Sequence, residues 1–83
     1  MEKVLVNLFV PSLGERYDVY IPTFLRVEEI TSLLAKTMVD LSAHQYVSSG
    51  EEFLCSLDQN QLLRQERTLA DYDIVNGEHL MLC

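Results

Sequence analysis

The stretch TLADYDIVNGEHLMLC, residues 68–83, carries two local signals that predict how this chain ends. Thr68 and Asp71 stand three positions apart, which is the spacing of a capping box and favours a short helical turn. Asn76-Gly77 is a turn signal, because glycine takes up positive φ without steric cost. The stretch therefore predicts a helical turn, then a tight turn, then a last strand.

Leu80 and Leu82 alternate with Met81 in that last strand, which we place at residues 79–83. Successive side chains of a strand point to opposite faces, so the leucines face a core and Met81 faces outward. The segment KVLVNLFV, residues 3–10, is rich in β-branched residues and predicts the first strand. Its core side would be Val4, Val6, Leu8 and Val10, and its outer side Lys3, Leu5, Asn7 and Phe9. We expect these two strands, the most apolar of the chain, to pair in parallel at the centre of a sheet.

A hairpin is predicted directly after the first strand. The segment PSLGE, residues 11–15, is a turn built on Pro11 and Gly14. It leads into a second strand at residues 16–21, which Pro22 ends. One side of this strand carries Tyr17, Val19 and Ile21, and the other carries Arg16, Asp18 and Tyr20.

The spacing of apolar residues changes to three or four positions over residues 27–41, which predicts an amphipathic helix. Glu28 and Glu29 lie in its first turn, where the helix dipole favours negative charge. No good capping residue immediately precedes Val27, so the sequence leaves the helix start open. A polar loop, residues 42–52, should follow the helix. The buried helix face would consist of Val27, Ile30, Leu34, Met38 and Leu41.

Three short segments complete the chain before residue 68. FLCSL, residues 53–57, predicts a third strand, DQNQ, residues 58–61, a turn, and Leu62-Leu63 at most a very short fourth strand. The order of elements predicts an α+β fold: a mixed sheet of four to five strands with one helix packed across one face. With 83 residues, 48% of them hydrophobic, residues 1–83 should form a single domain around one core.

Thirteen acidic and six basic side chains give a net charge of −7. This excess of acid argues against nucleic acids and anionic membrane surfaces as partners, because both would be repelled. The acids are scattered, which favours a solvated surface over a docking face for a basic partner. The apolar run of residues 4–10 is too short to span a membrane and has no cleavage site after it. We therefore expect a cytoplasmic protein without direct membrane insertion.

Cysteine and histidine are too sparse to predict a metal site or a nucleophilic centre. Cys55 and Cys83 have no paired spacing, and in a cytosolic chain we expect them to be reduced. With these two cysteines, the distant His44 and His79 do not make a zinc site. His79 and Cys83 share one strand at a separation of about 13 Å, too far for a hydrogen bond. There is no Gly-rich phosphate loop, so we predict no catalytic, cofactor-binding or metal-binding residue.

The quoted stretch closely resembles the Thr-Leu-Ser-Asp-Tyr-Asn-Ile segment and the final strand of ubiquitin. The chain resembles more closely the YukD/EsaB family of small bacterial ubiquitin-like proteins encoded with type VII secretion systems. The features shared with this family are YDVYIPTFL (residues 17–25), the apolar helix directly after it, and a late pattern Leu-x-Asp-x-x-Ile-x-Asn-Gly-[Asp/Glu]-x-Leu. In this chain the pattern consists of Leu69, Asp71, Ile74, Asn76, Gly77, Glu78 and Leu80. The resemblance covers nearly the whole chain and implies a ubiquitin-like β-grasp fold.

The resemblance implies a cytoplasmic accessory or regulatory component of an export machine, whose protein partners include membrane or ATPase components. It carries over no catalytic residue, and it implies that Tyr72 braces a neighbouring loop through its hydroxyl. Ubiquitin and the related sulfur carriers end in two glycines, whereas this sequence stops at Cys83, and its lysines are Lys3 and Lys36. We therefore expect a protein that is not conjugated. The alternatives are a general ubiquitin-like adaptor or scaffold unrelated to secretion, and a sulfur or acyl carrier.

The outward face of the sheet is the candidate site for protein binding, because an apolar patch with no helix over it usually marks a contact surface. Two alternatives stay open: Leu5 and Phe9 simply cover one another, or a register shifted by one residue exchanges the two faces. Self-association through the same face is a third outcome. The predicted site residues are Leu5, Phe9, Leu13, Cys55 and Met81, with Cys83 beside them.

Overall fold

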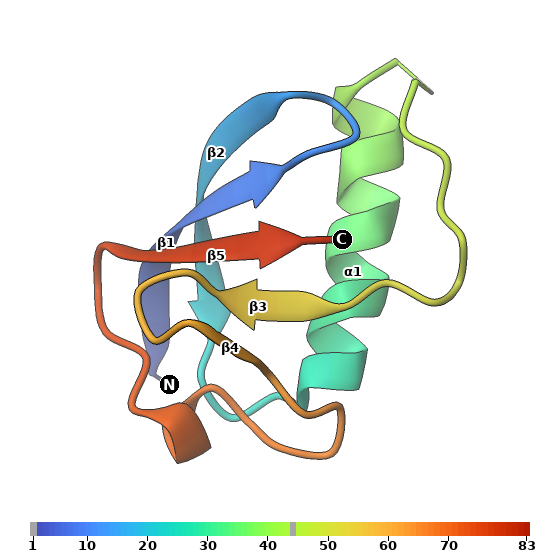
Figure 1. Ribbon diagram of the computed structural model, residues 1–83. Helices are drawn as coiled ribbons and strands as arrows, with labels where there is room; N and C mark the ends of the chain where they lie inside the picture. The colour runs from blue at the N-terminus through green and yellow to red at the C-terminus, as the bar shows by residue number, and fades with distance from the viewer. Residues whose placement is uncertain (1, 44) are drawn as a thin grey trace.

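The computed structural model describes residues 2–43 and 45–83, which form one sheet and one long helix (Figure 1). In the described part of the chain, no helix is long and apolar enough to cross a membrane. The elements in chain order are β1 (Lys3–Val10), β2 (Glu15–Pro22), α1 (Val27–Leu41), β3 (Leu54–Ser56), β4 (Gln61–Leu62), the 3-10 helix η1 (Ala70–Tyr72) and β5 (Glu78–Leu82).

The sheet has the order β2-β1-β5-β3-β4 (Figure 1). The first and last strands of the chain, β1 and β5, pair in parallel at its centre, with Leu8 opposite Leu80. All other strand pairs are antiparallel. The predicted α+β fold, with a mixed sheet of five strands and one helix, is therefore confirmed.

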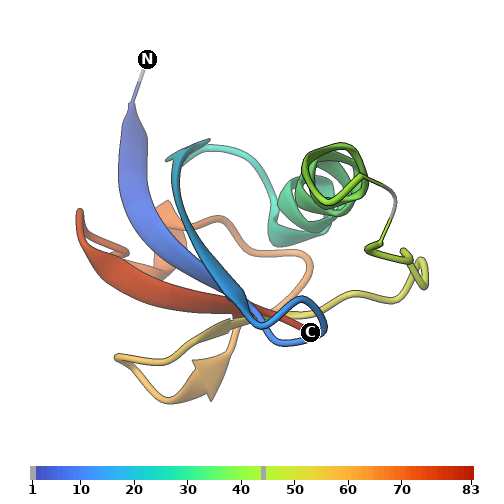
Figure 2. The ribbon, with the colours of Figure 1, turned by 90° about the horizontal axis from the view of Figure 1, so that it is seen from above.

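Helix α1 packs across one face of the sheet and leaves the opposite face uncovered (Figure 2). The core between helix and sheet contains the four predicted side chains of β1 and the leucines of β5. The predicted buried face of α1 is right except at its end, where Leu41 is 59% exposed. Leu41 is the last residue of the helix, and Thr31 and Ala35 are buried on its inner side instead. The helix start is held by Glu29, whose side chain accepts a hydrogen bond from the Arg26 backbone N–H at 3.1 Å.

The ends of the shorter strands differ from the predicted ones by one or two residues. β2 extends by one residue at each end of the predicted range, while β3 is confined to Leu54–Ser56. β4 is Gln61–Leu62 and not Leu62-Leu63, because Leu63 turns into the core and is buried. β5 begins at Glu78, one residue early, and ends at Leu82.

Both local signals in residues 68–83 are confirmed. The Thr68 backbone N–H donates to Asp71 Oδ2 at 2.9 Å, and the Asp71 backbone N–H donates to Thr68 Oγ1 at 3.2 Å. Gly77 has φ +89°. The turn is also tied to β1, because the Leu5 backbone N–H donates to Asn76 Oδ1 at 2.9 Å and the Gly77 N–H donates to the Leu5 carbonyl at 2.8 Å. These contacts set the point at which β5 begins to pair with β1.

Two acidic side chains are buried, so the expectation of a wholly solvated acidic surface is wrong for Glu52 and Glu78. Burial is tolerated because each carboxylate accepts several hydrogen bonds. The polar loop predicted for residues 42–52 is likewise partly internal: Tyr46 is buried and its hydroxyl donates to Glu52 Oε2 at 3.1 Å.

Candidate protein-binding face of the sheet

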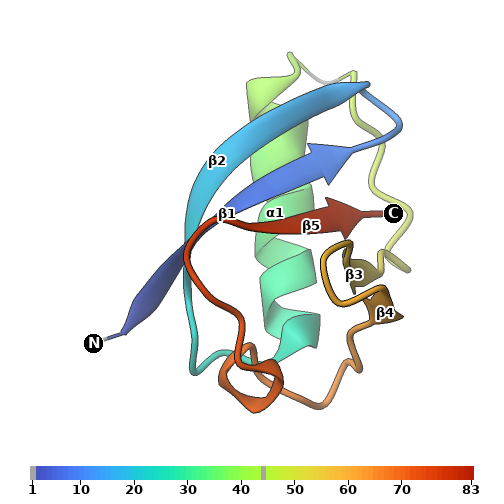
Figure 3. The same ribbon diagram turned by 60° about the vertical axis from the view of Figure 1, so that its left-hand side comes forward.

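One apolar row crosses the uncovered face of the sheet. Phe9 of β1 lies opposite Met81 of β5, Met81 lies opposite Cys55 of β3, and Cys55 lies opposite Leu62 of β4. Directly opposed residues of neighbouring strands share a face, so these four side chains form a continuous line, which we call the Met81 row. Figure 3 views the sheet with α1 behind it, so that the strands carrying the row face the reader.

The structure brings three of the five predicted site residues together and separates the other two. Phe9, Cys55 and Met81 belong to the Met81 row, and each is partly buried. Leu5 lies four positions before Phe9 on β1 and is opposite Tyr20 of β2. Leu5 is therefore outside the row, about 13 Å from Phe9 at the rise of a strand.

Leu13, at the tip of the hairpin, does not extend the outer patch. It packs against the buried core cluster, because the turn folds it toward the helix side of the sheet. Its backbone N–H donates to the Val10 carbonyl at 3.0 Å, which holds the turn close to the end of β1.

The apolar surface of Phe9 is covered by a basic side chain from the neighbouring strand. The Arg16 guanidinium carbon lies 4.7 Å from the centroid of the Phe9 ring, in cation–π contact. Lys3 stands in the same way over Tyr20, with its Nζ 5.1 Å from the ring centroid. The alternative in which Leu5 and Phe9 cover one another is therefore wrong. The alternative of a register shifted by one residue is wrong as well, because the outward side chains of β1 are the predicted ones.

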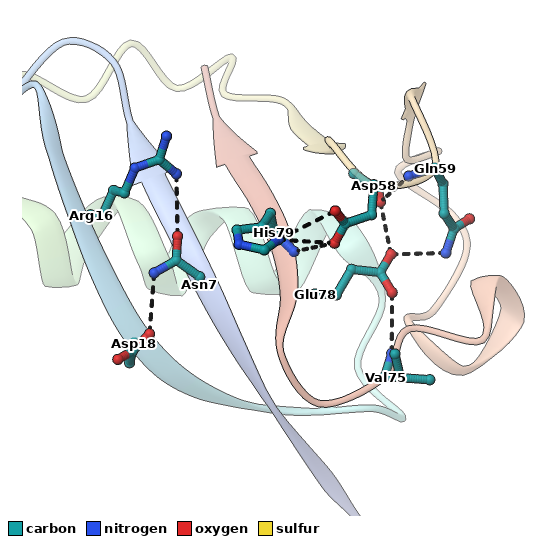
Figure 4. A network of polar contacts seen from close by, with 9 residues as sticks. Asn7, Arg16, Asp18, Asp58, Gln59, Val75, Glu78 and His79 are labelled. Atoms are coloured by element: carbon teal, nitrogen blue, oxygen red, sulfur yellow. Dashed lines mark hydrogen bonds and ion pairs between the residues drawn. The ribbon is translucent and has the colours of Figure 1, made fainter.

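In the strand register a polar row lies between the Met81 row and Leu5, and Figure 4 shows its side chains. Asn7 lies between Asp18 of β2 and His79 of β5. Its amide Nδ2 donates to Asp18 Oδ1 at 3.2 Å, and its Oδ1 accepts a hydrogen bond from Arg16 Nη1 at 3.3 Å. The hydrogen bond to Asn7 and the contact with the Phe9 ring together fix the position of the Arg16 guanidinium.

Asp58 and His79 form an exposed pair at the β3 end of the polar row (Figure 4). The His79 backbone N–H donates to Asp58 Oδ2 at 2.8 Å, and His79 Nδ1 lies 3.1 Å from the same oxygen. The hydrogen bond from the His79 backbone, followed by that from its ring, lowers the pKa of Asp58 below its ordinary value of 3.8.

The buried carboxylate of Glu78 joins three parts of the chain beneath this pair (Figure 4). Its Oε2 accepts hydrogen bonds from Ser56 Oγ at 2.7 Å and from Gln59 Nε2 at 2.9 Å. Its Oε1 accepts one from the Val75 backbone N–H at 3.3 Å. Glu78 thus fixes the turn after β3 against the turn that precedes β5.

Tyr72 has the structural role that was expected. The Arg64 backbone N–H donates to the Tyr72 hydroxyl at 2.8 Å, so the tyrosine braces the loop that follows β4. The Tyr72 carbonyl also accepts a hydrogen bond from Gln59 Nε2 at 2.9 Å. Tyr72 therefore stabilises the fold through these two hydrogen bonds.

Cys55 and Cys83 are free thiols, and burial, followed by the neighbouring Cys55 thiol, raises the pKa of Cys83 above its ordinary value. A raised thiol pKa disfavours the nucleophilic thiolate. His44, the second histidine weighed from the sequence, lies outside the described residues. Within residues 2–43 and 45–83, no group of three His, Cys, Asp or Glu side chains is placed to hold a metal ion.

Sequence reasoning missed Leu62 and Arg16 as members of this face. Leu62 is 55% exposed and ends the Met81 row. In the sequence it is one of two adjacent leucines, and nothing there indicates which of the two side chains faces outward. Arg16 was correctly placed on the outer side of β2. The missing information was the antiparallel register that sets Arg16 opposite Phe9.

Comparison with known proteins agrees with this architecture. A family model described as "WXG100 protein secretion system (Wss), protein YukD" matches residues 5–82. No curated protein sequence matches the chain.

Two of the similar solved structures are ubiquitin-like domains of EccD proteins, and a third is a chain of an inner membrane complex. The EccD5 ubiquitin-like domain from Mycobacterium xenopi has a TM-score of 0.80 at 16% identity, over 100% of this chain and 94% of that one. The ubiquitin-like domain of the Mycobacterium tuberculosis type VII secretion system protein ECCD1 has a TM-score of 0.66 at 18% identity, over 99% and 98%. A chain of the MycP5-free ESX-5 inner membrane complex has a TM-score of 0.79 at 19% identity, over 100% of this chain and 21% of that one. At these identities the structures show the fold, which is ubiquitin-like.

Proposed function

This chain belongs to the YukD family of the WXG100 protein secretion system, and on that premise we propose that it is a non-conjugating accessory or regulatory protein of a type VII secretion system that acts by binding other proteins. The family and the ubiquitin-like fold place it among secretion-associated ubiquitin-like domains. The proposed partners are membrane or ATPase components of the secretion machine. In support, one of the similar structures is itself part of an inner membrane complex.

The observation that carries this proposal is the Met81 row on a sheet face that no helix covers. Phe9, Met81 and Cys55 lie side by side on three neighbouring strands, with the exposed Leu62 at the end. The exposed Phe53 and Leu57 flank Cys55 on the same face, and polar or charged side chains such as Asn7 and Asp58 lie beside the row. An apolar centre with a polar rim is the usual anatomy of a protein interface.

The scarcity of lysines leaves few acceptor groups on which chains of such a protein could be built. The lysines are Lys3 and Lys36, and the Lys3 ammonium is engaged over the Tyr20 ring. Intact-mass measurement of the native protein would establish its true C-terminus. Covalent adducts on other proteins, detected with an antibody against this chain, would overturn the proposal of non-conjugation and favour a carrier or modifier.

We place the protein in the cytoplasm. The free thiols of Cys55 and Cys83 suit a reducing compartment. Cell fractionation, followed by thiol alkylation before lysis, measures both the compartment and the thiol state. Recovery outside the cytoplasmic and membrane-associated fractions would contradict this location.

The binding face is tested by capture of secretion components from the membrane fraction of the native organism. We expect the Leu62→Asp and Met81→Asp double variant to lose capture by about tenfold or more, because a charge in the centre of an apolar contact costs about 2 kcal/mol. Mass spectrometry identifies what is captured, and circular dichroism checks that the variant is folded. Leu62→Asp alone serves as the milder variant, since its exposed position leaves the fold unaffected.

The matched control is Val47→Asp with Val75→Asp, two exposed positions away from the Met81 row. It introduces the same charge and should retain capture. Equal capture by both double variants would contradict the binding face. Capture of proteins unrelated to secretion, lost in the row variant, would favour the general adaptor. A sedimentation mass that rises with concentration and falls in Leu62→Asp would assign the row to self-association.

A further inference from the structure

A groove of about 1000 Å³ runs along the helix, on a different part of the molecule from the Met81 row. One wall is the face of α1 that carries Glu28, Ala35 and Asp40. The other wall is the segment of residues 48–53 that leads into β3, and Gln65 lies at the groove as well. In Figure 1 this segment descends beside α1 on the side of the molecule away from the hairpin strand β2.

The wall opposite the helix is held in place by the buried Glu52 carboxylate. Its Oε2 accepts hydrogen bonds from Ser48 Oγ at 2.8 Å, from the Ser49 backbone N–H at 3.1 Å and from the Tyr46 hydroxyl at 3.1 Å. The Glu52 carbonyl accepts a further bond from Gln65 Nε2 at 3.2 Å. These contacts fix the wall to its own segment and to Gln65, which lowers the ordering cost of binding.

The groove combines an apolar surface with a surplus of negative charge. Val39 is half-buried and lines the groove. Phe53 lies where the groove meets β3, but its backbone pairs with Cys83, so its side chain shares the outer face of the sheet with Cys55. Three carboxylates with exposed side chains, Glu28, Asp40 and Glu51, lie around it. Among the described residues that line the groove, Lys36 is the one basic side chain.

We propose that this groove binds a short peptide segment of a partner protein that carries both apolar and basic side chains. An apolar side chain of the segment would rest on Val39, while lysine or arginine groups would pair with the carboxylates. The net charge of −7 adds long-range attraction for the same kind of segment.

This inference goes beyond the proposed function, because it adds a second binding surface with a different chemistry. The groove lies at the helix, and the Met81 row lies on the face of the sheet that α1 leaves uncovered (Figure 2). Two partners can therefore bind one copy of the chain at the same time. The protein would then hold two partners together, one bound through a basic segment in the groove and the other bound at the Met81 row.

The experiment uses a fluorescent synthetic amphipathic peptide of leucine and lysine as the probe, with anisotropy as the readout. We expect the double variant Asp40→Asn and Glu51→Gln to bind the probe about five- to tenfold more weakly, as expected for two exposed charge pairs. The same peptide with glutamate in place of lysine should not bind.

The matched control is Glu2→Gln with Asp73→Asn, which removes the same charge from exposed positions outside the groove. It should change the affinity by less than about twofold, since distant exposed charges are largely screened at physiological salt. Equal loss in both double variants would overturn the proposal, because whole-molecule charge would then explain binding. Absence of binding to the wild-type chain would overturn it as well.

Two further measurements separate this surface from the proposed function. Amide chemical shifts should change around Ser32, Lys36 and Gly50 when the probe binds, and changes spread evenly over the acidic surface would contradict the groove. The Leu62→Asp and Met81→Asp variant should bind the probe as well as the wild-type chain does. Loss of probe binding in that variant would assign the peptide to the sheet face and overturn the groove.

Discussion

Some acidic side chains in this protein are buried because several hydrogen-bond donors surround the carboxylate. Glu52 is the clearest case. Burial disfavours its charged form, but the hydrogen bonds from Ser48, its own backbone, Ser49 and Tyr46 outweigh that effect and lower its pKa below 4.5. The carboxylate is thus charged at neutral pH and holds the groove wall.

The pKa of Tyr46 is shifted in the opposite direction, upward. Burial, followed by the hydrogen bond to Glu52 and the charge of that carboxylate, raises the pKa of Tyr46 from 10.0 to about 12. The folded state therefore keeps the phenol neutral where the unfolded chain would ionise it. The contribution of Tyr46 to stability is complete below pH 10 and is lost as the pH rises towards 12.

We predict that the free energy of unfolding falls between pH 10 and pH 12, and that part of this fall is absent in Tyr46→Phe. At pH 7 the same variant should be less stable by about 1 kcal/mol, because Glu52 loses one hydrogen-bond donor. Urea unfolding at several pH values measures both effects. Tyr20→Phe, an exposed tyrosine, is the control and should follow the wild-type pH curve. An unchanged alkaline fall in Tyr46→Phe would show that other groups cause it.

At the scale of secondary structure, the start of each helix is capped by an acidic residue that lies three positions further along the chain. At η1 the capping is mutual. Glu29 caps the backbone of Arg26 at the start of α1. Asp71 and Thr68 cap one another at the start of η1, and the bond to the Thr68 backbone lowers the pKa of Asp71 below 3.8. The η1 cap matters for the sheet because the turn that follows it delivers Asn76 and Gly77 to β1.

We predict that Thr68→Ala destabilises the protein by about 1 kcal/mol, because it removes the side chain that accepts the Asp71 N–H. Thr68→Ser keeps that oxygen and should cost clearly less. The free energy of unfolding from urea denaturation gives both values. If Thr68→Ser and Thr68→Ala were equally destabilising, the lost methyl group, and not the cap, would account for the change.

At the scale of the whole molecule, charge and shape act together. The chain has extents of 32 × 26 × 22 Å and a net charge of −7. In dilute salt the Debye length is about 30 Å, so the acidic groups repel one another across most of the molecule. Arg64 and Glu66 form an exposed ion pair at 2.9 Å, and such pairs contribute little. Repulsion among the remaining acids therefore dominates the electrostatics of folding.

We predict that the urea midpoint rises when ionic strength increases from about 0.01 M to about 0.15 M, because the Debye length falls from about 30 Å to about 8 Å. Sodium chloride should serve as the salt and urea as the uncharged denaturant. A midpoint that falls with salt would indicate that attractive ion pairs outweigh the repulsion. The Glu2→Gln and Asp73→Asn control variant should show a smaller rise, since it carries less negative charge.

The sequence by itself determined the elements whose signals are local. The helix of residues 27–41 follows from a spacing of three to four residues, and its bounds agree with the structure. The alternation in β1 correctly divided its side chains between core and outer face. The capping pair and the Asn-Gly turn of residues 68–83 correctly predicted the short helical turn and the start of the last strand, because each acts over a few residues and requires no distant partner.

Only the tertiary structure decided which outward residues become neighbours. Leu5 and Phe9 share a face in the sequence pattern, but Asn7 and its contacts with Asp18 and Arg16 divide them in the sheet. Leu62 joined the row through its position opposite Cys55. The Glu78 carboxylate became internal through donors from the region of β3, Ser56 and Gln59, which are distant in sequence. The physical reason is that alternation sets the face a side chain occupies, whereas lateral contacts depend on the register and packing of segments that are distant in sequence.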